Sequence, residues 1–148
     1  MIKENIEQLN EKFGIKFAVK KLTPDLKKEY LEFRINFLQE ELDELRQANQ
    51  EEKAEDIVDA LIDLVVVALG TLDSFDVDID KAWFRVHFAN MTKEVGVNKT
   101  RQNILNLPDL IKPKEWEEPF HGDNIGTIKE IYNAGDWKDI NGMYWNTI

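Results

Sequence analysis

Apolar residues recur at helical spacing over much of the chain. The first such run has intervals of four, three and four residues, at Ile2, Ile6, Leu9 and Phe13. This pattern predicts an amphipathic helix, and Gly14 is a typical residue to end it. We expect residues 15–22 to form a linker.

A second and longer helix is predicted over about residues 24–48. Thr23 suits its N-cap, and a proline followed by an acid is typical of a first helical turn. A polar turn near residues 47–52 then separates it from a third helix over about residues 54–72. Asp78 or Asp80 can cap a fourth helix, which we expect to run to about Glu94.

The last third of the chain is less regular. Residues 95–121 contain three prolines, which interrupt helices, so we expect them to be irregular. A short helix is expected near residues 123–133, before a tail with Trp137, Tyr144 and Trp145. Because no segment shows convincing strand alternation, the predicted fold class is all-α: a four-helix bundle with an irregular C-terminal arm.

Composition narrows the possible functions. The chain of 148 residues has no cysteine, which excludes disulfide scaffolds, thiolate zinc sites and cysteine nucleophiles. Its 19 basic and 29 acidic residues give a net charge of −10, which argues against binding a nucleic-acid backbone. The N-terminus lacks the apolar core of a signal peptide, and the longest apolar run, Leu64 to Leu69, is too short to cross a membrane. We therefore expect a cytoplasmic protein with no membrane partner.

The negative charge is concentrated in one segment. Residues 40–63 contain ten acids and two bases, a net charge of −8. A solvated helix face is the ordinary explanation of such a segment. Carboxylates gathered to hold cations are the other.

Helical periodicity favours the second explanation. On the second predicted helix, Glu41 and Glu44 continue the stripe of Tyr30, Phe33 and Phe37, which should face the core. The third predicted helix is apolar around most of its circumference, so we expect it to be buried. Its acids nevertheless share one stripe, at Asp56, Asp59 and Asp63.

Buried carboxylates are costly when unpaired, and the segment offers only Arg46 and Lys53 as bases. For Asp56, near a helix start, exposure to solvent remains a plausible alternative. The other explanation is that the second and third predicted helices present carboxylates to each other across a gap filled by divalent cations. Oxygen ligands without cysteine or clustered histidine indicate Mg²⁺ or Mn²⁺.

Other metal motifs do not fit. A di-iron bundle requires Glu-x-x-His on two helices, but the chain has only two histidines, and Phe84 instead of a glutamate stands three residues before His87. The segment that begins at Asp76 resembles an EF-hand loop only at its start. Its sixth position is Lys81 instead of glycine, and its twelfth is a histidine instead of glutamate.

Several motifs together resemble a known family. Residues 40–44 match Glu-Glu-x-x-Glu, residues 56–59 match Glu-x-x-Asp with Asp56 in place of the glutamate, and residues 86–93 are similar to His-x-x-Asn-Met-Ser-Lys. In this order, they resemble the MazG-like all-α nucleoside triphosphate pyrophosphohydrolases of bacteria and phages, which are relatives of phosphoribosyl-ATP pyrophosphohydrolase and dimeric dUTPase. The resemblance covers about residues 1–112. We therefore predict a helical catalytic domain over 1–112 and an extension of unknown role over 113–148.

The resemblance implies an enzyme that hydrolyses (deoxy)nucleoside triphosphates between the α and β phosphates, in bacterial or phage-infected cytosol. It also implies two or three Mg²⁺ ions per site, which Mn²⁺ could replace, and a homodimer or a dimer of dimers. Five residues are then expected to bind metal, of which the first two are also expected to be catalytic: Glu41, Glu44, Asp56, Asp59 and Asp63. Glu40 and Glu55 lie beside these ligands as possible additions.

The fourth predicted helix is expected to bind the substrate, through Trp83, His87, Asn90 and Lys93. Three of them also have a structural explanation: core packing for the tryptophan, a structural role for the histidine, and a favourable helix-dipole contact for the lysine. Two alternatives to the triphosphatase remain open. One is a related hydrolase of phosphoribosyl-ATP or of a nucleoside diphosphate. The other is a non-enzymatic acidic protein that mimics nucleic acid.

Overall fold

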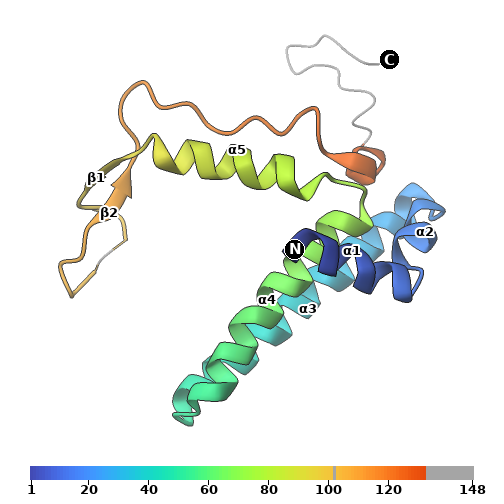
Figure 1. The fold of residues 1–148 in the computed structure, drawn as a ribbon, viewed down its shortest axis with the longest axis horizontal. Helices are drawn as coiled ribbons and strands as arrows, with labels where there is room; N and C mark the ends of the chain where they lie inside the picture. The colour runs from blue at the N-terminus through green and yellow to red at the C-terminus, as the bar shows by residue number, and fades with distance from the viewer. Residues whose placement is uncertain (102, 133–148) are drawn as a thin grey trace. The chain divides into compact units, whose positions relative to one another are not determined.

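A computed structural model describes residues 1–101 and 103–132 (Figure 1). These residues are mainly helical, as predicted. Five α-helices span Ile2–Lys12 (α1), Ile15–Lys20 (α2), Pro24–Gln50 (α3), Ala54–Ser74 (α4) and Ile79–Met91 (α5). A two-stranded antiparallel hairpin, Glu94–Gly96 (β1) with Asp109–Ile111 (β2), and a 3₁₀ helix, Gly126–Glu130 (η1), complete the described elements.

The chain forms two compact units. The first contains Met1–Ile79 together with the chain from Ile125, and the second contains Asp80–Asn124. These units are groups of residues that pack together, whereas the boundary predicted between residues 112 and 113 separates a catalytic domain from an extension. That boundary stays a prediction.

The first unit is organised around the long hairpin of α3 and α4. Helices α1 and α2 pack against α4 at the end of the hairpin away from its turn (Figure 1). There Ile6, Leu69 and Ile79 form a buried cluster, against which Val66 and Leu72 pack. This end of the hairpin is therefore the hydrophobic core of the unit.

Buried hydrogen bonds hold α1 to α4, and partly buried ones hold α3 to α4. Arg34 donates from Nε to Thr71 Oγ1 at 2.9 Å and from Nη2 to the Val67 carbonyl at 3.0 Å. Asn10 donates to Asp73 Oδ2 at 2.9 Å and to the Gly70 carbonyl at 3.1 Å. Gly70 also makes room for the Arg34 guanidinium, because a Cβ at residue 70 would lie 3.0 Å from Arg34 Nη2.

A fully buried lysine ties α3 to the segment that follows the second unit. Lys27 Nζ donates to the carbonyls of Leu22 and Lys20, at 2.6 and 3.1 Å, and lies 3.2 Å from Glu130 Oε1. At the start of the same 3₁₀ helix, Gly126 has a φ of 54° and passes so close to the chain that a Cβ would lie 1.9 Å from the Phe75 carbonyl oxygen. These contacts place η1 against the first unit.

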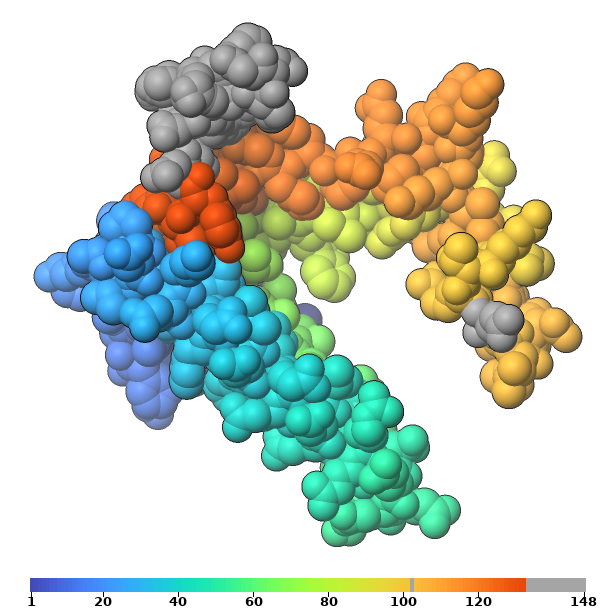
Figure 2. Space-filling model, turned by 180° about the vertical axis from the view of Figure 1, so that it is seen from behind, coloured from blue at the N-terminus to red at the C-terminus, as the bar shows by residue number. Residues whose placement is uncertain are grey.

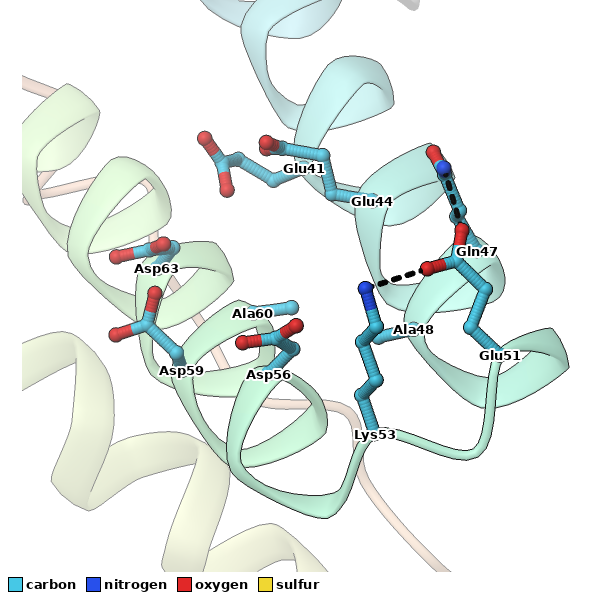
Figure 3. Close-up of a pocket in the computed structure, with 10 residues that line it drawn as sticks. All are labelled: Glu41, Glu44, Gln47, Ala48, Glu51, Lys53, Asp56, Asp59, Ala60 and Asp63. Carbon is cyan, nitrogen blue, oxygen red and sulfur yellow. Dashed lines mark hydrogen bonds and ion pairs between the residues drawn. The ribbon is translucent and has the colours of Figure 1, made fainter.

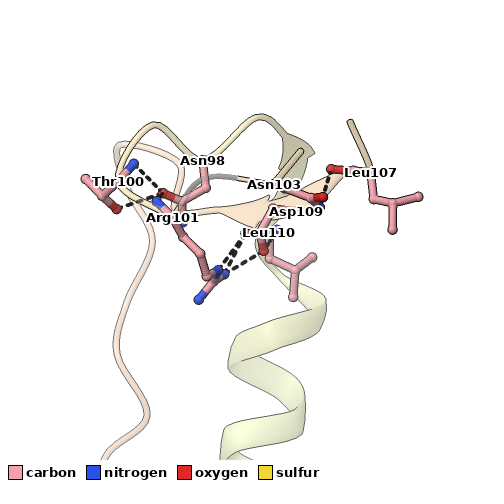
Figure 4. A network of polar contacts seen from close by, with 7 residues as sticks. All are labelled: Asn98, Thr100, Arg101, Asn103, Leu107, Asp109 and Leu110. Atoms are coloured by element: carbon pink, nitrogen blue, oxygen red, sulfur yellow. Dashed lines mark hydrogen bonds and ion pairs between the residues drawn. The ribbon is translucent and has the colours of Figure 1, made fainter. Parts of the chain in front are cut away.

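In the second unit, the C-terminal arm runs beside α5. Trp116 Nε1 donates to the Ala89 carbonyl at 2.7 Å, and Arg85 Nη2 donates to Asp123 Oδ2 at 3.0 Å. Beyond α5, the connection between β1 and β2 is held by its own polar contacts (Figure 4). Arg101 Nε donates to Asp109 at 3.0 Å, and Asn98 Oδ1 accepts the Thr100 backbone N–H at 2.9 Å.

Several local expectations were wrong. Residues 15–20 form α2 instead of a linker, because Gly14 takes a left-handed φ of 64° that ends α1 and lets a new helix start at once. The irregular stretch contains the small β-hairpin, whose three-residue strands are too short to show alternation. The short helix expected near 123–133 is present, as the 3₁₀ helix η1. Trp137, Tyr144 and Trp145 lie outside the described residues.

The all-α class is confirmed, but the predicted burial of the third helix is not. In α4, the half next to α1 is buried, whereas Val58, Leu61 and Ile62 near the turn are 48–63% exposed. On α3, Phe33 is likewise exposed instead of facing the core. None of the described helices is both long enough and apolar enough to cross a membrane.

Candidate active site

The turn between α3 and α4 brings the two acidic stripes face to face. Helix α3 continues to Gln50, and Glu52 adopts a left-handed φ of 57° that reverses the chain before α4 starts at Ala54. Ala48 and Ala60 are both buried where the helices meet. Larger side chains at these two positions would push the helices apart, so the alanines allow the close approach.

All five predicted metal ligands line one pocket of about 280 Å³ on this hairpin (Figure 3). Glu41 and Glu44 project from α3, and Asp56, Asp59 and Asp63 project from α4 toward them. We call this the acidic pocket. Gln47, Ala48, Glu51, Lys53 and Ala60 complete its lining.

Glu41 is the most perturbed group in the acidic pocket. Its side chain is only 9% exposed, and its Oε2 is buried without a hydrogen-bond partner. Burial, then a hydrogen bond with Glu44, and then the negative charges of Glu44, Asp63 and Glu40 raise the pKa of Glu41 to about 6. A group with this pKa can exchange a proton near neutral pH.

Asp63 is affected in the same way. Burial, followed by the charge of Asp59, raises the pKa of Asp63 above its ordinary value. The lysine in the pocket does not relieve the acids on the two stripes, because Lys53 pairs with Glu51 at 2.8 Å. The same Glu51 accepts a hydrogen bond from Gln47 at 2.7 Å. The expected shortage of local bases is therefore present in the folded chain.

The chemistry of these residues fits divalent cations. The donors are carboxylate oxygens, which Mg²⁺ prefers, and one of them is the buried Oε2 of Glu41 without a partner. Among the described residues, no three histidine or acidic side chains are already drawn together as a metal cluster. Mutual repulsion of the like charges acts against such a cluster until a cation is present.

The solvent exposure of the acids differs from the expectation of inward-facing ligands. Glu41 is buried and Asp63 is half-buried, whereas Glu44, Asp56 and Asp59 are exposed at the mouth of the pocket. Glu40 and Glu55 do not line it. The alternative that Asp56 meets solvent is thus correct, although its side chain still faces the pocket.

The four predicted substrate-binding residues lie on or just after α5, in the second unit. Trp83 and His87 are exposed, and Asn90 and Lys93 are half-buried. Lys93 Nζ lies 5.1 Å from the centre of the Trp116 ring, a cation–π contact. Their relation to the acidic pocket stays a prediction.

Sequence reasoning missed Trp116, because nothing in a proline-rich stretch indicated that it packs on α5. It also assigned no role to Gln47 and Glu51, which line the acidic pocket. Sequence reasoning also did not predict that Arg85 pairs with Asp123. The helical spacing of Gln47 and Glu51 relative to Glu44 was the available signal.

The fold and the acidic pocket together define a class of protein, the all-α MazG-like pyrophosphohydrolases. Within this class, residues 9–90 match the family model described as phosphoribosyl-ATP pyrophosphohydrolase. The match covers more than half of the chain, and the protein belongs to this family of nucleotide pyrophosphohydrolases, whose members typically depend on Mg²⁺. The match includes all five predicted metal ligands and ends at Asn90. No curated protein matches the chain.

Proposed function

We propose that the protein hydrolyses (deoxy)nucleoside triphosphates at the bond between the α and β phosphates, releasing a monophosphate and pyrophosphate. The observation that carries this proposal is the acidic pocket, in which five carboxylates from two helices face one another without a paired base. Membership of a nucleotide pyrophosphohydrolase family supports the reaction type.

The residues of the pocket have distinct roles in this proposal. Glu41, Glu44, Asp56 and Asp59 would hold two or three Mg²⁺ ions, with Asp63 as a further ligand. The ions supply positive charge that attracts the triphosphate and stabilises the leaving pyrophosphate. Without them, a triphosphate with about four negative charges would be repelled by the carboxylates.

Glu41 is also the proposed proton acceptor. Its Oε2 is buried and has no hydrogen-bond partner, so it offers an open acceptor for the proton of a nearby water. It would take the proton of the attacking water, a transfer that the negative charge of neighbouring Glu44 favours. The base and phosphates of the substrate would contact Trp83, His87, Asn90 and Lys93 on the fourth predicted helix.

Phosphoribosyl-ATP is a second candidate substrate, favoured by the description of the matching family. A nucleic-acid mimic is disfavoured, because a mimic needs acids spread over exposed faces. Here six of the ten acids of residues 40–63 line one pocket, and one of the six, Glu41, is buried.

Product analysis tests the proposal. The protein is incubated with each common NTP and dNTP and with phosphoribosyl-ATP, in Mg²⁺ or in EDTA, and the products are separated. We expect monophosphate and pyrophosphate, lost in EDTA and reduced at least 100-fold by Glu44→Gln. Asp43→Asn is the matched control, because this exposed acid on the same helix does not line the pocket. Folded, Mg²⁺-loaded protein that turns over none of these substrates would exclude the proposed function.

A further inference from the structure

One basic side chain lines the acidic pocket. Lys53 is the N-cap residue of α4, and among the described residues that surround the pocket it alone carries a positive charge. It comes from the turn, at the end of the pocket away from Glu41 and Asp63 (Figure 3). The two ends of the pocket therefore differ in charge, and a substrate with unlike ends can bind in a preferred direction.

The ammonium group of Lys53 is held in place by its neighbours. Its Nζ lies 2.8 Å from Glu51 Oε1, and Glu51 Oε2 accepts a hydrogen bond from Gln47 Nε2 at 2.7 Å. Both oxygens of Glu51 are thus engaged at the same end of the hairpin. An ammonium group has three N–H donors, so the contact with Glu51 leaves donors of Lys53 for a further anion.

The turn end of the hairpin is open to solvent. Gln47, Glu51 and Lys53 are all exposed. On the face shown in Figure 2, the tip of the hairpin near residue 50 stands free of α1 and α2. An anion can therefore reach Lys53 without a change in the fold, and a charged product can leave from this end.

The geometry of phosphoryl chemistry relates the two ends of the pocket. The seven residues from Asp56 to Asp63 span about 10 Å of α4, at 1.5 Å per residue. Glu41, the proposed proton acceptor, lies at the buried end, so the attacking water must be there as well. In an in-line displacement the leaving oxygen lies opposite the attacking one. The leaving group then extends away from Glu41, toward the turn and Lys53.

We propose that Lys53 binds the β and γ phosphates of the substrate, so that the triphosphate lies along the hairpin with its pyrophosphate end at the turn. This orientation rests on the proposed function. The water oxygen forms a bond to the α phosphorus, and the water proton passes to Glu41. The bond from the α phosphorus to the bridging oxygen breaks, and its electron pair stays on the pyrophosphate, beside the ammonium of Lys53. Because this negative charge develops in the transition state, Lys53 should affect kcat as well as KM.

Product binding tests the orientation without turnover. Calorimetric titration in Mg²⁺ measures the Kd of the full-length protein for inorganic pyrophosphate and for each common nucleoside monophosphate. We expect Lys53→Gln to raise the Kd for pyrophosphate about tenfold, the loss expected when a charged hydrogen bond is removed, and to leave the Kd for monophosphates unchanged. Arg46→Gln is the matched control, because it removes the other base of residues 40–63, which is exposed and does not line the pocket. It should change neither Kd.

The ion pair with Glu51 gives Lys53 a structural explanation as well, namely closure of the turn. Glu51→Gln breaks this pair but keeps the ammonium, so it should not weaken pyrophosphate binding. A structural role instead predicts equal losses in Glu51→Gln and Lys53→Gln, and equal losses would contradict the proposal. Urea unfolding shows that each variant is folded before its Kd is measured. Lys53→Arg, which keeps the charge, should recover most of the affinity for pyrophosphate.

Kinetics with the best nucleotide substrate tests the step itself. Lys53→Gln should lower kcat about tenfold, and Lys53→Arg should restore most of it. The inference is wrong if Lys53→Gln weakens binding of monophosphates instead of pyrophosphate, if it changes neither, or if the wild-type protein does not bind pyrophosphate. If the wild-type protein binds pyrophosphate through Lys53 but hydrolyses no nucleotide, the proposed function fails instead, and Lys53 is still a phosphate-binding residue.

Discussion

Replacing Glu41 by glutamine removes one charge from the acidic pocket and leaves the shape of the side chain almost unchanged. Burial and neighbouring acids raise the pKa of this carboxyl from 4.5 to about 6 in the folded protein. Raising a pKa by one pH unit corresponds to about 1.4 kcal/mol. The ionised form of Glu41 therefore lowers the free energy of unfolding of the metal-free protein by about 2 kcal/mol at most. The pocket opens to water, which reduces this to about 1 to 2 kcal/mol.

The sign of the effect follows from proton binding. A carboxyl with a raised pKa binds its proton more tightly in the folded state, so the free energy of unfolding falls as the pH rises from about 4.5 to about 6. Below this range both states are protonated and the penalty is absent. Above it the penalty is complete. Glu41→Gln should therefore stabilise the metal-free protein at pH 7.5 but not at pH 4.

Urea unfolding in EDTA at fixed protein concentration measures this difference. We expect Glu41→Gln to raise the free energy of unfolding by about 1 to 2 kcal/mol at pH 7.5. Asp43→Asn, an exposed control on the same helix, should change it by less than about 0.5 kcal/mol. Equal effects of Glu41→Gln at pH 4 and pH 7.5, or a destabilisation at pH 7.5, would show that the buried charge does not act as described.

Three further predictions concern the metal and the packing of the first unit. Mg²⁺ should raise the Tm of the wild-type protein in a thermal shift assay, and EDTA should reverse this rise. The Asp59→Asn variant should lose most of the rise in Tm. An equal rise in the variant would exclude Asp59 as a ligand. Lys27→Met should lower the free energy of unfolding by about 2 to 4 kcal/mol, because it leaves two partly buried carbonyls and Glu130 without their partner. The exposed control Lys28→Met should have little effect in the same urea titration. Gly126→Ala should lower the free energy of unfolding by more than about 2 kcal/mol, because its Cβ would overlap the Phe75 carbonyl oxygen. Gly14→Ala should lower it by only about 1 kcal/mol, because Gly14 has a similar φ but open space around it. Equal losses would show that the overlap at residue 126 is relieved without cost.

Local sequence determined most of the helices and the acidic stripes. The start of α3 follows from Thr23, whose side chain accepts the Leu26 N–H at 3.3 Å, and from the proline after it. The spacing of Glu41 and Glu44, and of the three aspartates on α4, predicts which face each acid occupies. These properties depend on residues three or four positions apart, so they can be predicted without knowing the tertiary structure.

Contacts between distant segments decided the rest. Periodicity predicted that α4 is buried, but only packing shows that α1 and α2 reach just one half of it. The buried position of Lys27 depends on Glu130, which is more than 100 residues away in the chain. The pKa of Glu41 likewise depends on Asp63 from the facing helix. Burial and electrostatic coupling arise between surfaces brought together by folding, and for this reason the tertiary structure was needed to turn two acidic stripes into one pocket.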